Sequence, residues 1–262
     1  MVDISCRILY NQAMFNQQHI SYIVISSILT VLLLALAGVF VKDDKPKNFI
    51  LKFSAIITVA IHYSNLWVDY FMTGGEATIE NNQILPVYPC NVVMWMLLVA
   101  SLIKNKNRVL FHVLGDFCFY GGIVCGIIGI VLNKNFGNTP TLADYDILKG
   151  MVSHSTMLFG CIYLKTGGFI KIRAFNALSV TIGLASFVVC GWFVNSLYEH
   201  FGMEPPDGMF LKSNPYIPVS PMILGIGVVI LMFLILALWE LRLPREERWY
   251  VKLQAVFSKK KA

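Results

Sequence analysis

Apolar residues along this chain are gathered into seven long runs, separated by short polar segments. Most runs approach about 20 residues, which is the length that a helix needs to cross the hydrocarbon layer of a membrane. They do not alternate with a period of two, as the strands of a membrane barrel do. The pattern predicts an all-α, polytopic membrane bundle of about seven transmembrane helices, at residues 19–41, 49–72, 86–103, 108–132, 148–166, 173–196 and 219–241.

The basic residues between these runs predict the orientation of the bundle, because cytoplasmic loops carry an excess of Lys and Arg. If the N-terminus lies outside, 17 of the 21 basic residues lie on the cytoplasmic side. The outer side then keeps only Arg7, Lys134, Lys149 and Lys212. We therefore expect an N-out, C-in topology, with a seven-helix transmembrane domain at residues 1–241 and a basic cytoplasmic tail at residues 242–262.

Composition agrees with a membrane environment and explains the net charge. Charged residues make up 14% of the chain, whereas a soluble domain has about 25%. The net charge of +6 is concentrated in the cytoplasmic loops and the tail, so we expect no nucleic-acid partner. A basic tail of this kind is typical of contact with anionic lipid headgroups, and the alternative is a docking site for a protein partner. The sequence predicts no particular oligomeric state.

Small residues recur at helical spacing in the fourth run, at Gly115, Cys118, Gly122, Gly126 and Gly129. Small side chains allow a second helix to approach closely inside a membrane. We expect this stripe to be a packing face.

Polar and ionisable side chains inside the runs are costly in a membrane, so each is a functional candidate. The N-out topology places one set of them near the outer interface, because odd-numbered runs begin there and even-numbered runs end there. The set comprises His19, Asp69, Cys90, His154, Asn195 and Glu199. We therefore expect the functional site at the outer end of the bundle.

Within this set, Cys90 and His154 can form a reactive pair. Each lies about one helical turn inside its run, so the helical rise gives them similar depths. A cysteine reacts as the thiolate, which a histidine base or the positive end of a helix favours. Pro89 is typical of a first helical turn and puts Cys90 near such an end. The alternative is that Cys90 is a packing residue and that His154 bonds a backbone carbonyl or a headgroup.

Two other polar groups favour a transporter. Asp116 is a deep carboxylate in the fourth run, and His62 shares a helix face with Asn65 in the second. Deep acids often mark proton or ion paths, and interhelical hydrogen bonds are the alternative explanation. The histidines and cysteines show no metal-binding spacing, so we expect no metal site.

Four segments, taken together and in order, resemble a known family. Residues 84–90, Ile-Leu-Pro-Val-Tyr-Pro-Cys, resemble the L-P-L-H-x-C signature of the bacterial YwaF-type membrane proteins, which are related to the transmembrane protein 164 acyltransferases. Residues 18–19, Gln-His, are similar to the family's early histidine, and residues 153–154, Ser-His, to its S-H-G element. Residues 195–215 resemble the N…N-Y-M-F-L…P stretch before its last helix.

The resemblance implies acyl transfer between phospholipids. Cys90 is then the nucleophile that carries the acyl group as a thioester, and His154 is the general base. No metal or soluble cofactor is implied. Supporting roles, such as oxyanion stabilisation or orientation of the base, fall to His19, Asp69, Tyr88 and Asn195.

The sequence departs from the family pattern at two positions. Tyr88 stands where the signature has its histidine, and Ser155 stands where a glycine follows the second histidine. Tyrosine donates a hydrogen bond but is no base near neutral pH. If the signature histidine is essential, this chain is inactive or uses a different chemistry.

We therefore expect an integral protein of a bacterial plasma membrane that transfers acyl groups on phospholipids or related lipids at the outer-leaflet side. Hydrolysis of the acyl-enzyme is a variant of the same chemistry. The alternatives are a small-molecule or ion transporter that uses Asp116 and His62, and a non-catalytic lipid-binding protein that docks through its basic tail.

Overall fold

The computed structural model describes residues 15–72, 85–132, 141–212 and 220–251, and all regular structure within these ranges is helical. The prediction of an all-α bundle is confirmed. The helices are α2 (Gln17–Phe40), α3 (Asp44–His62), α4 (Asn65–Met72), α5 (Pro89–Leu102), α6 (Val109–Val131), α7 (Tyr145–Thr166), α8 (Asn176–His200) and α9 (Pro221–Glu240). Two short 3-10 turns, η3 (Gly208–Phe210) and η4 (Arg245–Glu247), follow α8 and α9.

Five of the described helices are long and apolar enough to cross a membrane: α2, α6, α7, α8 and residues Ile223–Glu240 of α9. The helix α5 is apolar and shorter. The bounds of these six helices lie within a few residues of the predicted runs. The chain is therefore a polytopic, integral membrane protein.

The run predicted at 49–72 differs, because the structure divides it into α3 and α4. Four charged residues in the first nine of α3 set it apart from the apolar helices. At the division, the Ser64 hydroxyl donates to the carbonyl of Ile61 at 2.5 Å. Such a bond competes with the regular helical pattern. The break leaves His62 as the last residue of α3.

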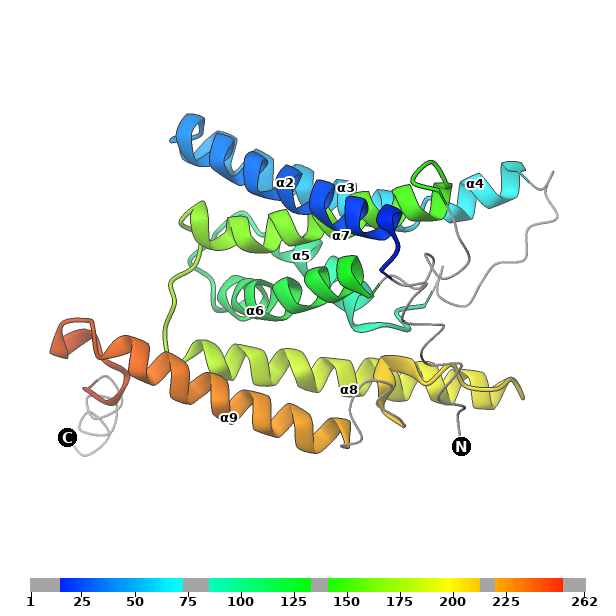
Figure 1. The fold of residues 1–262 in the computed structure, drawn as a ribbon. Helices are drawn as coiled ribbons and strands as arrows, with labels where there is room; N and C mark the ends of the chain where they lie inside the picture. The colour runs from blue at the N-terminus through cyan, green and yellow to red at the C-terminus, as the bar shows by residue number, and fades with distance from the viewer. Residues whose placement is uncertain (1–14, 73–84, 133–140, 213–219, 252–262) are drawn as a thin grey trace.

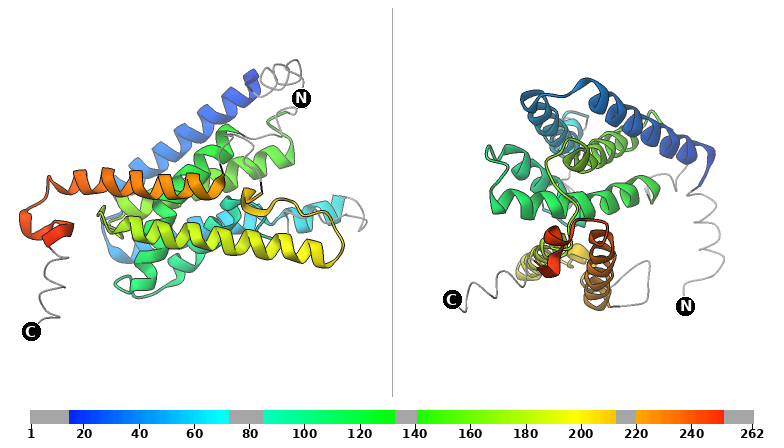
Figure 2. Two further views of the ribbon diagram at one scale, coloured as in Figure 1. Left: turned by 90° about the horizontal axis from the view of Figure 1, so that it is seen from below. Right: turned by 90° about the vertical axis from the view of Figure 1, so that its left-hand side faces the viewer.

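The helices form three tiers around a centre made by α6 and α7 (Figures 1 and 2). The helices α2 and α3 pack on α7, and α5 packs against both α3 and α6. On the other side α8 packs on α6, and α9 contacts α8. The largest buried apolar cluster lies between α5, α6 and α7 and includes Met94, Phe117 and Met157.

Small residues bring α6 close to α7, as the stripe predicts. A side chain at Gly122 would place its first carbon 2.2 Å from the sulfur of Cys161. At Gly126 the same carbon would lie 3.0 Å from Leu158. A side chain does not fit at Gly122, and at Gly126 it would require Leu158 to shift, so the glycines allow the close approach of the two helices.

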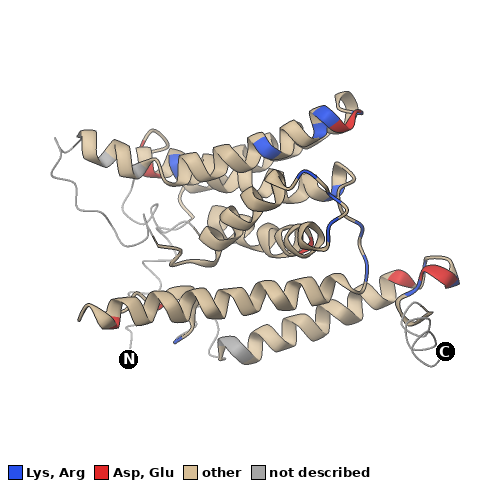
Figure 3. Ribbon diagram, turned by 180° about the vertical axis from the view of Figure 1, so that it is seen from behind, with Lys and Arg blue, Asp and Glu red and all other residues tan. Residues whose placement is uncertain are grey.

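Basic residues gather at one end of the bundle, where α2, α7 and α9 end (Figure 3). We call this the inner end, and we call the opposite end, where these helices begin, the outer end. The N-out, C-in topology was predicted from the Lys and Arg residues of the loops, and most of these residues lie together at the inner end (Figure 3). Residues 252–262, most of the predicted tail, lie outside the described ranges.

Lys106, in the inner connection between α5 and α6, leads to a prediction about pH. Its ammonium group donates to the carbonyls of Ala100 and Ser101, each at 3.0 Å, and lies 4.8 Å from the centre of the Phe111 ring. Burial, and then the charge of Lys52, lower the pKa of Lys106 to about 8 from its ordinary value of 10.5. Between these two pH values the unfolded chain binds more protons than the folded one, so stability rises with pH.

We expect the thermal unfolding midpoint in detergent micelles, measured relative to that of Lys106→Met, to rise from pH 8 towards pH 10.5. The comparison with the variant cancels the titration of all other groups. Parallel pH profiles for the two proteins would contradict the prediction.

Candidate functional site

Cys90 lies in the first turn of α5, at the outer end of the bundle. The helix begins at Pro89, and Tyr88 precedes it in an extended conformation. The Cys90 side chain is half-buried and packs against the main apolar cluster. The first amides of a helix carry a partial positive charge, which favours an anion such as a thiolate.

The Cys90 thiol belongs to a chain of hydrogen bonds that crosses from α5 to α3. It donates to Oδ1 of Asn91 at 3.3 Å. Nδ2 of Asn91 lies 3.2 Å from Nε2 of His62. Asn91 is fully buried, whereas His62 is half-buried. The sequence places these residues on different runs, and the contact joins the last residue of α3 to the first turn of α5.

His154 lies on α7 and is held from two sides. Its Nδ1 is 3.0 Å from the carbonyl of Gly150. Because a carbonyl only accepts, Nδ1 carries the proton of the neutral ring and Nε2 is the basic nitrogen. The ring packs on Gly129 of α6, where an added side-chain carbon would lie 2.3 Å from Nε2. The His154 ring is therefore fixed both in tautomer and in position.

His62 and His154 are close enough to influence each other electrostatically, and Lys149 lies within the same range of both. Lys149 also pairs with Asp146 at 3.3 Å. The outer half of the bundle thus brings together side chains from α3, α5 and α7.

Cys90 and His154 are not hydrogen-bonded to each other in the described part of the chain, where the thiol donates to Asn91. Along α6, Gly129 contacts His154, and Cys125 is an electrostatic neighbour of Cys90. These α6 positions are four residues apart, or about 6 Å along the helix. The predicted role of His154 as the base stays a prediction.

His19 is buried in the first turn of α2, and its Nε2 lies 3.3 Å from the carbonyl of Ile130. Ile130 follows Gly129, so the contact ties α2 to the part of α6 on which His154 packs. The backbone amide of His19 donates to the side chain of Asn16, which caps the helix.

Asn195 and Tyr88 contact η3, which closes the outer end beside α5. The buried Asn195 accepts from the amide of Gly208 at 2.8 Å, and the amide of Met209 donates to the Val87 carbonyl at 2.7 Å. The ring of Tyr88 lies 5.6 Å from that of Phe210. Asn195 thus supports the start of α5 indirectly. The side chain of the other predicted supporting residue, Asp69 on α4, lies outside the described part of the structure.

The residues from Asp207 to Phe210 have an unusual backbone. Asp207, Met209 and Phe210 all have positive φ values, between 52° and 57°. This left-handed region is disfavoured for residues with side chains. Three such residues within four positions keep this conformation only where surrounding contacts stabilise it. The contacts of η3 with Asn195 and Val87 are what impose it here.

Comparison with known proteins adds the family. A family model described as the TMEM164 family matches residues 14–243. The chain belongs to the TMEM164 family. No curated protein and no solved structure matches it. All of the site residues described above lie inside the matched range, whereas the basic residues after 243 lie beyond it.

In this TMEM164-family chain, Asp116 belongs to a separate cluster between α6 and α8. Its carboxylate accepts from the Ser179 hydroxyl at 3.2 Å and bonds the side chain of Asn176. Asn176 in turn accepts from the backbone amide of Arg173 at 2.5 Å. His62 is bonded to Asn91 instead. The two residues of the transporter hypothesis therefore lie in different clusters.

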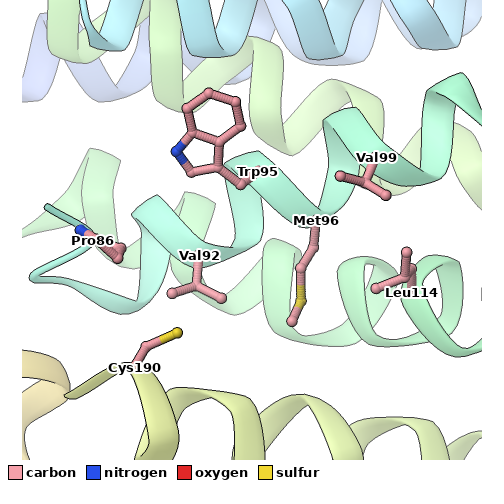
Figure 4. A pocket seen from close by; sticks show the side chains of 7 residues that line it. All are labelled: Pro86, Val92, Trp95, Met96, Val99, Leu114 and Cys190. Atoms are coloured by element: carbon pink, nitrogen blue, oxygen red, sulfur yellow. The ribbon is translucent and has the colours of Figure 1, made fainter. Parts of the chain in front are cut away.

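An apolar pocket lies between α5, α6 and α8 of this family member, with a volume of about 220 Å³ (Figure 4). Its lining residues are Pro86, Val92, Trp95, Met96, Val99, Leu114 and Cys190. The lining positions of α5 recur at helical spacing on one face of the helix, and Cys90 lies on the other face. Among the described residues, no group of three or more His, Cys, Asp or Glu side chains is placed to hold a metal ion.

Proposed function

We propose that this protein is a membrane-embedded acyltransferase that moves an acyl group between phospholipids or related lipids, with Cys90 as the nucleophile. The observation that carries the proposal is the chain of hydrogen bonds from the Cys90 thiol through Asn91 to His62. A second histidine, His154, lies beside His62. A polar cluster of this size is costly in a membrane and is typical of function.

In the first half of the reaction, the sulfur of Cys90 attacks the carbonyl carbon of a lipid ester. The thiol proton passes to Nε2 of His154, which is the basic nitrogen of that ring. The bond between the carbonyl carbon and the glycerol oxygen then breaks, and that oxygen takes the proton from His154. The products are a lysolipid and an acyl-thioester on Cys90. For this step the Cys90 thiol leaves its hydrogen bond with Asn91 and approaches Nε2 of His154.

In the second half, the hydroxyl group of a second lysolipid attacks the thioester. His154 takes the hydroxyl proton, the bond from the acyl carbon to sulfur breaks, and the proton returns to Cys90. Water in place of the lysolipid gives hydrolysis of the same intermediate. The apolar surroundings of the site favour the lipid acceptor.

Three further features support lipid substrates. The site lies at the outer end of the bundle, and in the proposed N-out topology this position suits substrates from the outer leaflet. The apolar pocket on the face of α5 opposite Cys90 has the chemistry of a site for a lipid chain other than the one that reacts. The basic inner end, together with the tail, suits contact with anionic lipid headgroups in a bacterial plasma membrane.

The test is to incubate the purified protein with a phospholipid that carries a labelled acyl chain. We expect a labelled protein from which hydroxylamine releases the chain, and we expect none from Cys90→Ala. The matched control is Cys125→Ala. It removes a second half-buried thiol, which lies on α6 close to Cys90. Absence of both thioester and acyl exchange in the wild-type protein, or equal labelling of Cys90→Ala, would overturn the proposal.

A further inference from the structure

In the described part of the structure the side chain of Asn91 accepts a hydrogen bond from the Cys90 thiol, and the backbone amides of Cys90 and Asn91 also face the sulfur. The carboxamide of Asn91 has an acceptor side and a donor side, and the two sides are used differently. Oδ1 faces the sulfur at 3.3 Å, and Nδ2 faces Nε2 of His62 at 3.2 Å. Because Asn91 is fully buried, its amide orientation depends on hydrogen bonds inside the protein, among them these two.

His62 is placed by its surroundings rather than by Asn91 alone. It is the last residue of α3, and its ring stacks edge-on against that of Tyr63 at 4.9 Å. The Tyr63 hydroxyl accepts in turn from the indole nitrogen of Trp95 at 2.9 Å. Since Nδ2 of Asn91 can only donate, Nε2 of His62 accepts and its Nδ1 carries the ring proton. This tautomer of the histidine therefore favours the orientation in which Oδ1 faces the sulfur.

This orientation of the side-chain amide suits the thiol, and it leaves a thiolate with the backbone amides as its donors. A thiol donates a hydrogen bond, which Oδ1 accepts, whereas a thiolate needs a donor. Rotation of the carboxamide by half a turn brings Nδ2 to the sulfur and Oδ1 to His62. The new arrangement is satisfied when His62 carries its proton on Nε2. This change of tautomer moves one proton from Nδ1 to Nε2 through water and leaves the ring neutral.

We propose that Asn91 and His62 are a positioning pair for Cys90, in which the amide accepts from the thiol before proton transfer and donates to the thiolate after it. The inference rests on the proposed function, in which the thiol proton passes to His154. His62 contacts Asn91 and not the sulfur. It acts through the amide, so it is a positioning residue.

The pair can be tested by the rate at which Cys90 is alkylated by iodoacetamide at neutral pH, followed on the Cys90 peptide by mass spectrometry. A hydrogen bond to a charged group contributes enough free energy that its loss lowers the rate by about tenfold. We expect this loss in Asn91→Ala and in His62→Leu. Cys190, which is half-buried and lines the apolar pocket, is the internal reference and keeps its rate.

A conservative variant separates positioning from simple packing. The side-chain amide of His62→Gln can accept or donate, as the two tautomers of histidine do, so we expect alkylation close to the wild-type rate. The matched control is Thr58→Val, which removes the 2.8 Å bond from α3 to Thr156 of α7 and leaves the amide untouched. Its Cys90 rate should not change.

Wild-type alkylation rates in both Asn91→Ala and His62→Leu would overturn the inference. Equal slowing in His62→Gln and His62→Leu would also overturn it, because the effect would then not depend on hydrogen bonding. If Asn91→Ala fails to fold, the two His62 variants decide the question alone. Alkylation needs no lipid substrate, so a protein that forms no thioester but shows the expected rates contradicts the proposed function and not the pair.

Discussion

Replacement of Gly129 by alanine is expected to lower thioester formation on Cys90 by about 100-fold, because a displacement of about 1 Å in a catalytic group has effects of this size. The added carbon would lie 2.0 Å from Cδ2 of His154, which is closer than any real contact. The imidazole must therefore swing away and give up its bond to the carbonyl of Gly150. The measurement is the rate of acyl-thioester formation with a labelled phospholipid.

The control for this prediction is Gly225→Ala on α9, where an added carbon has nothing within 4 Å. It introduces the same methyl group into an apolar helix and should leave the rate unchanged. Helix content and the unfolding midpoint of Gly129→Ala should stay near those of the wild type, since an imidazole at the edge of the core can move. Unchanged thioester formation in a folded Gly129→Ala would show that the position of His154 does not matter.

Replacement of Glu240 by alanine is expected to lower the free energy of unfolding by about 3 kcal/mol, the cost of two buried donors left without an acceptor. Glu240 ends α9 and is 1% exposed. One carboxylate oxygen accepts from the amide of Ala174 at 2.7 Å, and the other accepts from that of Trp249 at 2.6 Å. The residue thus joins three segments at the inner end. Unfolding in mixed micelles measures the change.

The neighbouring Glu247 supplies a control of the same residue type. It pairs with Arg173 at 2.6 Å, but its side chain is 46% exposed. An exposed ion pair contributes little, so Glu247→Ala should cost no more than about 1 kcal/mol. Glu240→Gln keeps one acceptor oxygen and should fall between the two alanine variants. Equal losses for Glu240→Ala and Glu247→Ala would show that the buried carboxylate has no special role.

The positions of most helices along the chain could be predicted from the sequence, because the length of each apolar run carries most of that information. The division between α3 and α4 could not, since the four polar residues from His62 to Asn65 lie within an otherwise continuous apolar run. Whether such residues break a helix depends on which carbonyl a side chain reaches, and here Ser64 reaches that of Ile61.

The site was predictable in its depth and not in its contacts. The cost of polar groups in a membrane singles out Cys90 and His154, and the topology puts both in the outer half. It does not show that the Cys90 thiol turns to Asn91, because that depends on how α5 is rotated against α3. The contacts of Asp116 with α8 and of Asn195 with the amide of Gly208 likewise depend on how the helices pack, which the sequence does not show.

The turn η3 also affects when the site can form during synthesis. The amide of Met209 is made long after α5 has left the ribosome, yet it holds the carbonyl of Val87 just before the Cys90 turn. A nascent chain that ends at residue 200 has the Cys90 helix and both histidines but lacks this support. The proposed nucleophile, Cys90, is therefore expected to reach its final environment only late in membrane insertion, after α8 is in place.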